Sequence, residues 1–255
     1  MSRTFSVAYG AVCYAIFFGT FLYLVGFLGN FGVPKSIDSG VPGPLAVALL
    51  VDGALLALFG IQHSGMARQG FKAWWTRIVP QPIERSTYVL VSSLVLILLY
   101  WAWRPIPEAV VRVEGSVART LLTGLYLGGY GIVLLSTFLI DHFDLFGLRQ
   151  VALHFQGRRY EEKRFATPWL YRLVRHPLYV GWLIAFWLTP DLTVGRVLFA
   201  AGMTAYILGA IPLEERDLAG TLGEPYLRWR ERTPRFVPRF GPQPSRAGER
   251  EPQAG

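Results

Sequence analysis

Two short polar motifs, separated by a long apolar stretch, carry the side chains best suited to bind a charged ligand. The first is Arg-His-Pro-Leu-Tyr at residues 175–179, and the second is Glu-Glu at residues 214–215. The stretch between them has only two charged residues, Asp191 and Arg196, near its middle. A chain that enters a membrane after the first motif, turns near Asp191 and returns before the second would bring both motifs to one membrane face. The spacing therefore predicts a helical hairpin whose two polar ends form one site.

The first motif is suited to an anion. Pro177 fits the first position of a helix, where its missing N–H costs nothing. That placement puts His176 near the helix cap and leaves free N–H groups at the same end, which is an anion-binding arrangement. The guanidinium of Arg175 can add a two-pronged contact to a carboxylate or phosphate.

The second motif is suited to the opposite charge. Glu214 and Glu215 can hold a cation or accept from ribose hydroxyls, and Tyr179 and Trp182 share a helix face that offers aromatic surface to a purine or a sulfonium. S-adenosylmethionine is a ligand with a carboxylate, a ribose, a purine and a positive centre. The alternative is an Arg–Glu bridge that only ties the hairpin ends together, with the aromatic residues as interface anchors.

The composition indicates a membrane protein. The chain has 255 residues, of which 52% are apolar and only 16% are charged, against about 25% charged in an ordinary soluble domain. The one cysteine, Cys13, lies in an apolar run, so neither a disulfide framework nor a cysteine metal site is available. We expect no metal site of any kind. The net charge of +8 fits Arg-rich loops beside a membrane better than nucleic-acid binding.

Six apolar segments could enter the membrane. The first lacks the short core and small-residue cleavage site of a signal peptide, so it is expected to be a retained span. The fifth is too short to cross about 30 Å of hydrocarbon alone, which fits a tilted or re-entrant helix. The segments are residues 5–28, 45–66, 86–103, 120–140, 178–189 and 196–213.

The distribution of basic residues predicts the orientation. With six crossings, 20 of the 25 Lys and Arg residues lie on the face that holds both termini, and five lie on the other face. The positive-inside rule then places both termini and the two polar motifs in the cytoplasm. The predicted location is a bacterial inner membrane.

The predicted fold is an all-α, polytopic integral-membrane helical bundle. It has five to six transmembrane segments, and its C-terminal helical hairpin forms a cofactor pocket on the cytoplasmic side. Residues 1–240 are predicted to form a single membrane-embedded domain. Residues 241–255 are rich in Pro, Gly and charge, and we expect them to be disordered.

Other polar clusters fall at the same ends of the predicted spans. They lie at residues 62–64, 84–88 and 141–144, and all four histidines of the chain are on or near this face. Helix ends collect polar residues simply because water is there, which is the structural interpretation. Ionisable groups just inside membrane spans also tend to mark a working site, which is the functional interpretation.

The two motifs resemble the signature of integral-membrane methyltransferases, a group that includes the isoprenylcysteine carboxyl methyltransferases and the phospholipid methyltransferases. The similarity covers residues 175–182, 214–218 and the Gly-Glu-Pro-Tyr at 223–226. One departure is Trp229, where the family often has a second tyrosine. The resemblance implies S-adenosylmethionine as cofactor, held by Arg175, His176, Pro177, Tyr179, Glu214 and Glu215, with Tyr226 in support.

A narrower resemblance covers nearly the whole chain. Residues 60–68, 80–90, 103–107 and 141–151 are similar to the methanethiol S-methyltransferases, which are related to NnrU-like membrane proteins of nitrite and nitric oxide metabolism. The implied reaction converts methanethiol to dimethyl sulfide by in-line transfer of a methyl group to a thiolate, a step that needs alignment above all.

That reaction requires a group that orients the thiol or takes its proton, because an alkyl thiol with a pKa above the ~8.5 of cysteine is mostly protonated at neutral pH. Candidates on the predicted cytoplasmic face are Tyr88, Glu84, Asp144, His142 and His63. Glu84 can instead form an interfacial ion pair with its neighbour Arg85, Asp144 can cap a helix, and His63 can be a satisfied interhelical histidine.

Other functions stay open at this stage. Methylation of a lipidated cysteine or another amphiphile would need a lateral opening between helices. A non-enzymatic transporter or an accessory protein of nitrogen-oxide metabolism should show polar residues at mid-span, where only Asp52 and a few hydroxyls qualify. The expected partners are a small thiol and membrane lipid, with no nucleic acid, and the sequence gives no oligomeric state.

Overall fold

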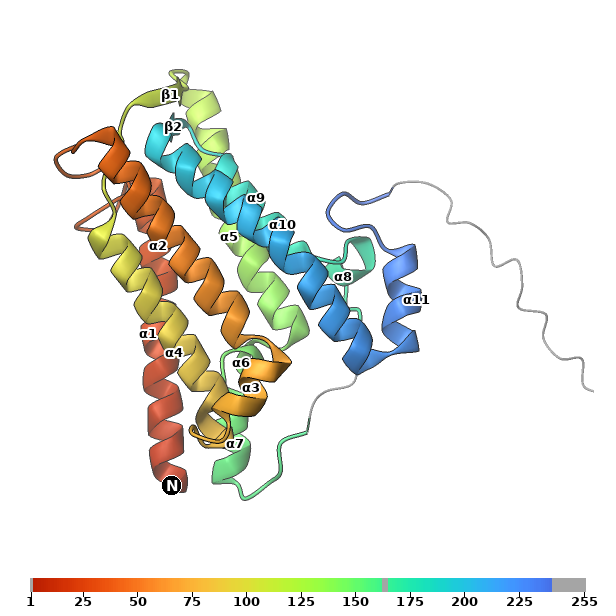
Figure 1. Ribbon diagram of the computed structural model, residues 1–255. Coiled ribbons are helices and arrows are strands. Elements are labelled where there is room, and N and C mark those ends of the chain that lie inside the picture. The colour runs from red at the N-terminus through yellow and green to blue at the C-terminus, as the bar shows by residue number, and fades with distance from the viewer. Residues whose placement is uncertain (1, 162–164, 240–255) are drawn as a thin grey trace, which may run out of the picture.

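Five long apolar helices form the body of the computed structural model, which describes residues 2–161 and 165–239 (Figure 1). Each of the five is long and apolar enough to cross a membrane, and a sixth apolar helix, α9, is shorter. The prediction of an all-α integral-membrane bundle with five to six segments is confirmed. The helices are α1 (Arg3–Gly29), α2 (Leu45–Met66), α4 (Gln81–Ala102), α5 (Ser116–Ile140), α9 (Pro177–Trp187) and α10 (Val194–Leu222).

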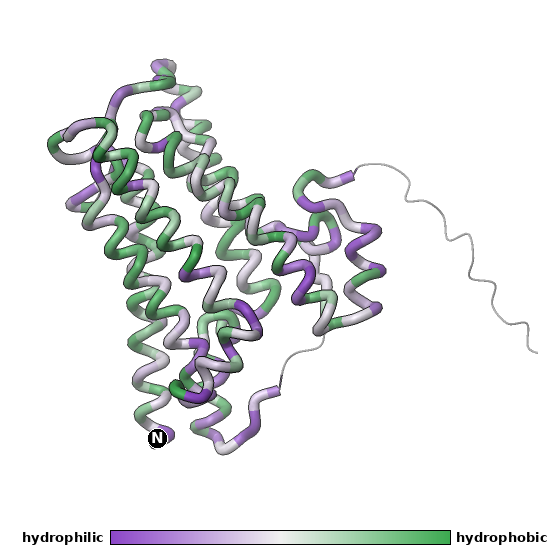
Figure 2. The backbone as a smooth tube through the Cα atoms, in the orientation of Figure 1, coloured by the Kyte–Doolittle hydropathy of each residue, from purple (hydrophilic) through white to green (hydrophobic). Residues whose placement is uncertain are grey.

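The short helices lie in two groups, one near the N-terminus and one beside the C-terminal end of α10 (Figure 1). Figure 2 shows that hydrophobic residues dominate the long helices and hydrophilic residues collect at their ends. One bundle end therefore carries most of the candidate site residues. The short helices are α3 (Gln69–Trp75), α6 (His142–Leu145), α7 (Leu148–Phe155), α8 (Leu170–Leu173) and α11 (Glu224–Arg232).

The hairpin of α9 and α10 turns at the opposite end through a small sheet that was not predicted. Strand β2 (Asp191–Thr193) pairs antiparallel with β1 (Ala109–Arg112), which lies in the loop between α4 and α5. The guanidinium of Arg119 donates to both oxygens of the Asp191 carboxylate, at 2.9 and 2.7 Å, and holds the pKa of that carboxyl below its usual range. The turn is therefore tied to the rest of the bundle.

Close backbone contact holds α9 against α5. A Cβ added at Gly129 of α5 would lie 2.7 Å from the Ala185 nitrogen and the Gly181 carbonyl oxygen of α9, closer than such atoms approach. Small residues let membrane helices pack this tightly and gain dispersion contacts. Three other glycines of α5, Gly124, Gly128 and Gly131, face open space.

The apolar core fills the space between the long helices. It includes Phe27 of α1, Tyr126 of α5, Phe186 of α9 and Phe199 of α10, each at most 2% exposed. Cys13 is a buried free cysteine. This packing fixes the relative position of α9 and α10, whose polar ends carry the two motifs.

Candidate active site

The segment that precedes α9 is held by the chain that follows α11. His176 caps α9 and Pro177 is its first residue, as the sequence predicted. The backbone N–H of Arg175 donates to the carbonyl of Pro234 at 2.8 Å, and that of His176 donates to Arg235 at 3.2 Å. The first motif is therefore fixed between the hairpin and the C-terminal segment, and Figure 1 shows α8 and α11 beside this end of α10.

The carboxylate of Glu215 joins the two motifs. It accepts from Arg175 Nε at 3.0 Å, from His176 Nε2 at 3.0 Å, and from Arg235 Nη2 at 3.4 Å. The side chains of Glu215 and His176 are 7% exposed and that of Arg175 is 12% exposed. Arg175 Nη1 also donates to two carbonyls of the C-terminal segment, those of Arg230 and Thr233. The predicted meeting of the hairpin ends is thus present.

Glu214 and two tyrosines border this cluster. The Tyr179 hydroxyl donates to Glu214 Oε2 at 2.8 Å. Tyr226 of α11 is 1% exposed, and its buried hydroxyl has no partner among the described residues. Burial and the carboxylates of Glu215 and Glu214 raise the pKa of Tyr226 to about 12. Tyr226 therefore keeps its proton at neutral pH, and its hydroxyl can donate a hydrogen bond to a ligand.

The aromatic residues near the motifs divide into two groups. The ring of Tyr179 lies 5.4 Å from that of His176, within the site. Trp182 packs instead in the core, against Phe21 at 6.0 Å and Tyr130 at 5.7 Å. Trp229 donates to the backbone carbonyl of Tyr171. Of the two aromatic residues expected to face a ligand, only Tyr179 borders the charged cluster.

A second polar cluster lies between α2 and α4. The Tyr88 hydroxyl is 3.1 Å from both ring nitrogens of His63, and His63 Nδ1 is 3.2 Å from the Ser92 hydroxyl. Tyr206 of α10 packs edge-on to the His63 ring. Tyr206 thus brings α10, the helix that also carries Glu214 and Glu215, against the second cluster.

Glu84 lies one helical turn before Tyr88 on α4. It is 7% exposed, and its carboxylate is 3.8 Å from Lys72 Nζ of α3. The expected partner Arg85 places its guanidinium 5.9 Å from the centre of the Tyr88 ring instead. Glu84 is therefore a buried acid at the edge of the second cluster.

His142 and Asp144 belong to separate contacts. His142 bonds to the hydroxyls of Tyr14 and Thr137, each at 2.8 Å, and burial lowers its pKa. Asp144 accepts from Gln150 at 2.9 Å and from Tyr160 at 3.1 Å. These hydrogen bonds satisfy both side chains and tie α1, α5, α6 and α7 together. The role of each of the five catalytic candidates stays a prediction.

Three residues of these clusters were not predicted from the sequence. Arg235 lies in the basic tail, where nothing distinguishes it from its basic neighbours. Ser92 is one turn after Tyr88 and Tyr206 is two turns before Glu214, so helical spacing from known candidates could have found both. The C-terminal segment contributes mainly backbone carbonyls, which no sequence motif reveals.

The chain is an integral-membrane helical protein with a charged cluster at the joined ends of a hairpin. It is 51% identical to a methanethiol S-methyltransferase of Crocosphaera subtropica over 94% of both chains, and 48% identical to one of Mycobacterium tuberculosis over 93% of this chain and 98% of that one. Nurim of Sus scrofa is 34% identical over 68% of this chain and 69% of its own. No family model and no solved structure matches. The chain belongs to the methanethiol S-methyltransferase family and is a methyltransferase.

Proposed function

We propose that this protein transfers a methyl group from S-adenosylmethionine to methanethiol and so forms dimethyl sulfide. The names of the relatives identify methanethiol as the thiol that those proteins methylate. The observation that carries the proposal is the cluster of Arg175, His176 and Glu215, which the hairpin and the C-terminal segment assemble at one end of the bundle.

Unsatisfied groups in the cluster fit this cofactor. The buried Tyr226 hydroxyl lacks a partner among the described residues, and Arg175 Nη2 makes no hydrogen bond there. Glu214 uses only Oε2 to accept from Tyr179, so Oε1 is available to a ribose hydroxyl or a cation. The guanidinium suits the cofactor's carboxylate and the acidic residues suit its ribose and positive charge. The residues that would hold it are Arg175, His176, Pro177, Tyr179, Glu214, Glu215 and Tyr226.

The protein's own residues would mainly orient and deprotonate the thiol. When bound, the cofactor supplies a methyl group on a positively charged sulfur, and in-line displacement moves that methyl to the thiolate and leaves S-adenosylhomocysteine. We assign the thiol proton to the pair formed by Tyr88 and His63, which lie within hydrogen-bond distance of each other. The proton then passes to water.

Replacement of Tyr88 by Phe tests this assignment. We expect kcat to fall by about 100-fold at neutral pH, since positioned proton transfer typically contributes 10²–10⁴-fold. The loss should shrink as the pH rises and more of the thiol is ionised in solution. The affinity for S-adenosylhomocysteine should stay within about twofold of wild type. Steady-state rates between pH 6 and pH 10 and titration calorimetry measure both quantities.

Two further variants make the test specific. Tyr14→Phe removes a hydroxyl that bonds His142 in the separate contact, and its pH profile should match that of the wild type. A changed profile in Glu84→Gln with an unchanged one in Tyr88→Phe would assign the proton to Glu84 and refute the Tyr88–His63 pair.

Headspace analysis tests the reaction itself. Purified protein supplied with S-adenosylmethionine and methanethiol should release dimethyl sulfide and S-adenosylhomocysteine in equal amounts, and neither should form when S-adenosylmethionine is omitted. Methylation of a prenylated cysteine with no turnover of methanethiol would contradict the proposal and favour an amphiphilic substrate.

We also propose that the site and both termini face the cytoplasm of a bacterial inner membrane, because with six crossings 20 of the 25 Lys and Arg residues lie on the side that holds the N-terminus. Cysteines introduced at Arg77 and Gly43 test this orientation, in a background in which Cys13 is replaced by Ser. In intact spheroplasts a membrane-impermeant maleimide should label position 43 alone. Labelling of position 77 alone would show that the protein has the opposite orientation in the membrane.

A further inference from the structure

Two adjoining cavities lie at the bundle end that carries β1 and β2, opposite the charged cluster. One has a volume of about 420 Å3 and includes Lys35 and Arg104 in its wall. The other, of about 490 Å3, lies between α1 and α4 and includes Gly19 and Ile97. Lys35 and Trp101 line both cavities, so together they form one continuous recess with a charged mouth and an apolar groove.

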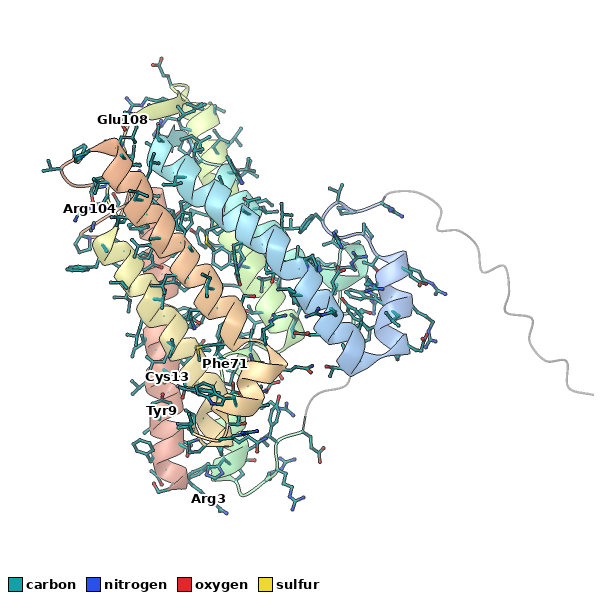
Figure 3. The ribbon with its side chains drawn as sticks, in the orientation of Figure 1. Arg3, Tyr9, Cys13, Phe71, Arg104 and Glu108 are labelled. Atoms are coloured by element: carbon teal, nitrogen blue, oxygen red, sulfur yellow. The ribbon has the colours of Figure 1, made fainter. Side chains whose placement is uncertain are left out.

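The mouth holds two cations close together. Lys35 Nζ donates to the carbonyls of Trp101 and Trp103, which leaves its third hydrogen for another acceptor. Burial and the nearby charge of Arg104 lower the pKa of Lys35. Arg104 is exposed, and its guanidinium has no hydrogen-bond or ion-pair partner among the described residues. Figure 3 labels Arg104 at the end of the bundle remote from Arg3.

The neighbouring acid does not neutralise this mouth. Asp52 is fully buried and accepts from the backbone N–H of Arg104 at 2.8 Å. Its single charge faces two cations, so the mouth keeps a net positive charge. An anion there would accept from both Lys35 and Arg104 and would relieve their mutual repulsion, which a membrane surface screens poorly.

The apolar part continues from this mouth toward the middle of the bundle. Along α1 it extends from Tyr23 to Ala15, eight residues or about 12 Å at 1.5 Å per residue, which approaches the ~15 Å depth of one leaflet's hydrocarbon. A Cβ added at Gly19 would meet nothing within 4 Å, so the groove is open there. Trp101 is 75% exposed where groove and mouth join, as expected of a residue at the membrane interface.

We propose that this recess binds one anionic phospholipid from the leaflet at the β1–β2 end. Its phosphate contacts Lys35 and Arg104, and an acyl chain lies in the groove between α1 and α4 beside Gly19. The positive charge of the mouth favours an anionic headgroup. The length of the apolar groove favours a ligand with an acyl chain over a free anion.

Native mass spectrometry of the full chain tests this site. Protein released from micelles that contain phosphatidylglycerol should retain one lipid molecule, and phosphatidylcholine should not be retained. Arg104→Gln removes the exposed cation but keeps the backbone bond to Asp52, and it should weaken retention roughly tenfold, as expected for loss of one charge-assisted hydrogen bond. Gly19→Leu adds a side chain whose Cβ meets nothing within 4 Å, fills the groove, and should abolish retention.

Two control variants make the result decisive. Arg77→Gln removes an exposed cation at the opposite end, and Gly128→Leu adds the same side chain at an open position of α5. Both should retain the lipid as wild type does. Equal retention by all four variants, equal retention of phosphatidylcholine, or displacement by millimolar inorganic phosphate would overturn the proposal. A dimer that is lost in Gly19→Leu would instead assign the groove to a second copy of the chain.

Discussion

The variant Glu215→Gln is expected to lose most of its affinity for S-adenosylhomocysteine, by at least about 100-fold. In the wild type, the carboxylate of Glu215 accepts from Arg175, His176 and Arg235, and it links the polar ends of α9 and α10. Loss of that charge leaves the buried guanidinium of Arg175 without compensation, so both ends of the hairpin should shift away from the ligand, and each 1.4 kcal/mol of lost binding free energy is tenfold in affinity. Titration calorimetry with S-adenosylhomocysteine measures the loss.

Two comparisons separate a binding defect from misfolding. Arg235→Gln removes the half-exposed and most distant donor, at 3.4 Å, and should weaken binding only severalfold. Glu224→Gln changes an exposed carboxylate on α11 that pairs with Arg228 at 3.6 Å, and should bind as wild type does. A melting temperature near that of the wild type combined with undiminished affinity in Glu215→Gln would contradict the site assignment.

The variant Gly129→Val is expected to have the largest effect on the fold. The added side chain would begin 2.7 Å from backbone atoms of Gly181 and Ala185, which cannot yield as a flexible side chain can. Overpacking of this kind typically costs about 1–3 kcal/mol, occasionally more. Because α9 begins with the first motif, a displaced α9 should reduce both the melting temperature and methyl transfer, the latter at least about tenfold, since a shift of 1 Å can cost 10²-fold.

The same substitution at an open position of α5 provides the control. A Cβ added at Gly124 meets nothing within 4 Å, so the melting temperature and activity of Gly124→Val should stay near those of the wild type. If Gly129→Val and Gly124→Val behave alike, close contact between α5 and α9 does not position the site.

Much of the bundle could be predicted from the sequence because membrane spans have a strong local signal. Residues 45–66 were predicted as a span, and α2 occupies Leu45–Met66. The hairpin was predicted from the position of Asp191 and Arg196 between two polar motifs. The strands β1 and β2 were not predicted, because three or four residues carry too little periodicity to distinguish a strand from a turn.

The candidate site was less predictable than the fold. The charges of Arg175 and Glu215 indicated their contact, since a hairpin brings its two ends together. The sequence also placed His63 and His142 at the same end of the bundle. It could not show that His142 uses both ring nitrogens in bonds to Tyr14 and Thr137 while His63 bonds Tyr88, because which face of a helix meets which neighbour is decided by packing.

Photo-crosslinking of S-adenosylmethionine to the purified protein tests the central claim most directly. Irradiation with radiolabelled cofactor, followed by peptide mapping, should place the label on both ends of the hairpin, in residues 171–182 and 213–226. Excess S-adenosylhomocysteine should prevent the labelling. Label confined to the loops at the β1–β2 end, or labelling that does not saturate, would contradict the account.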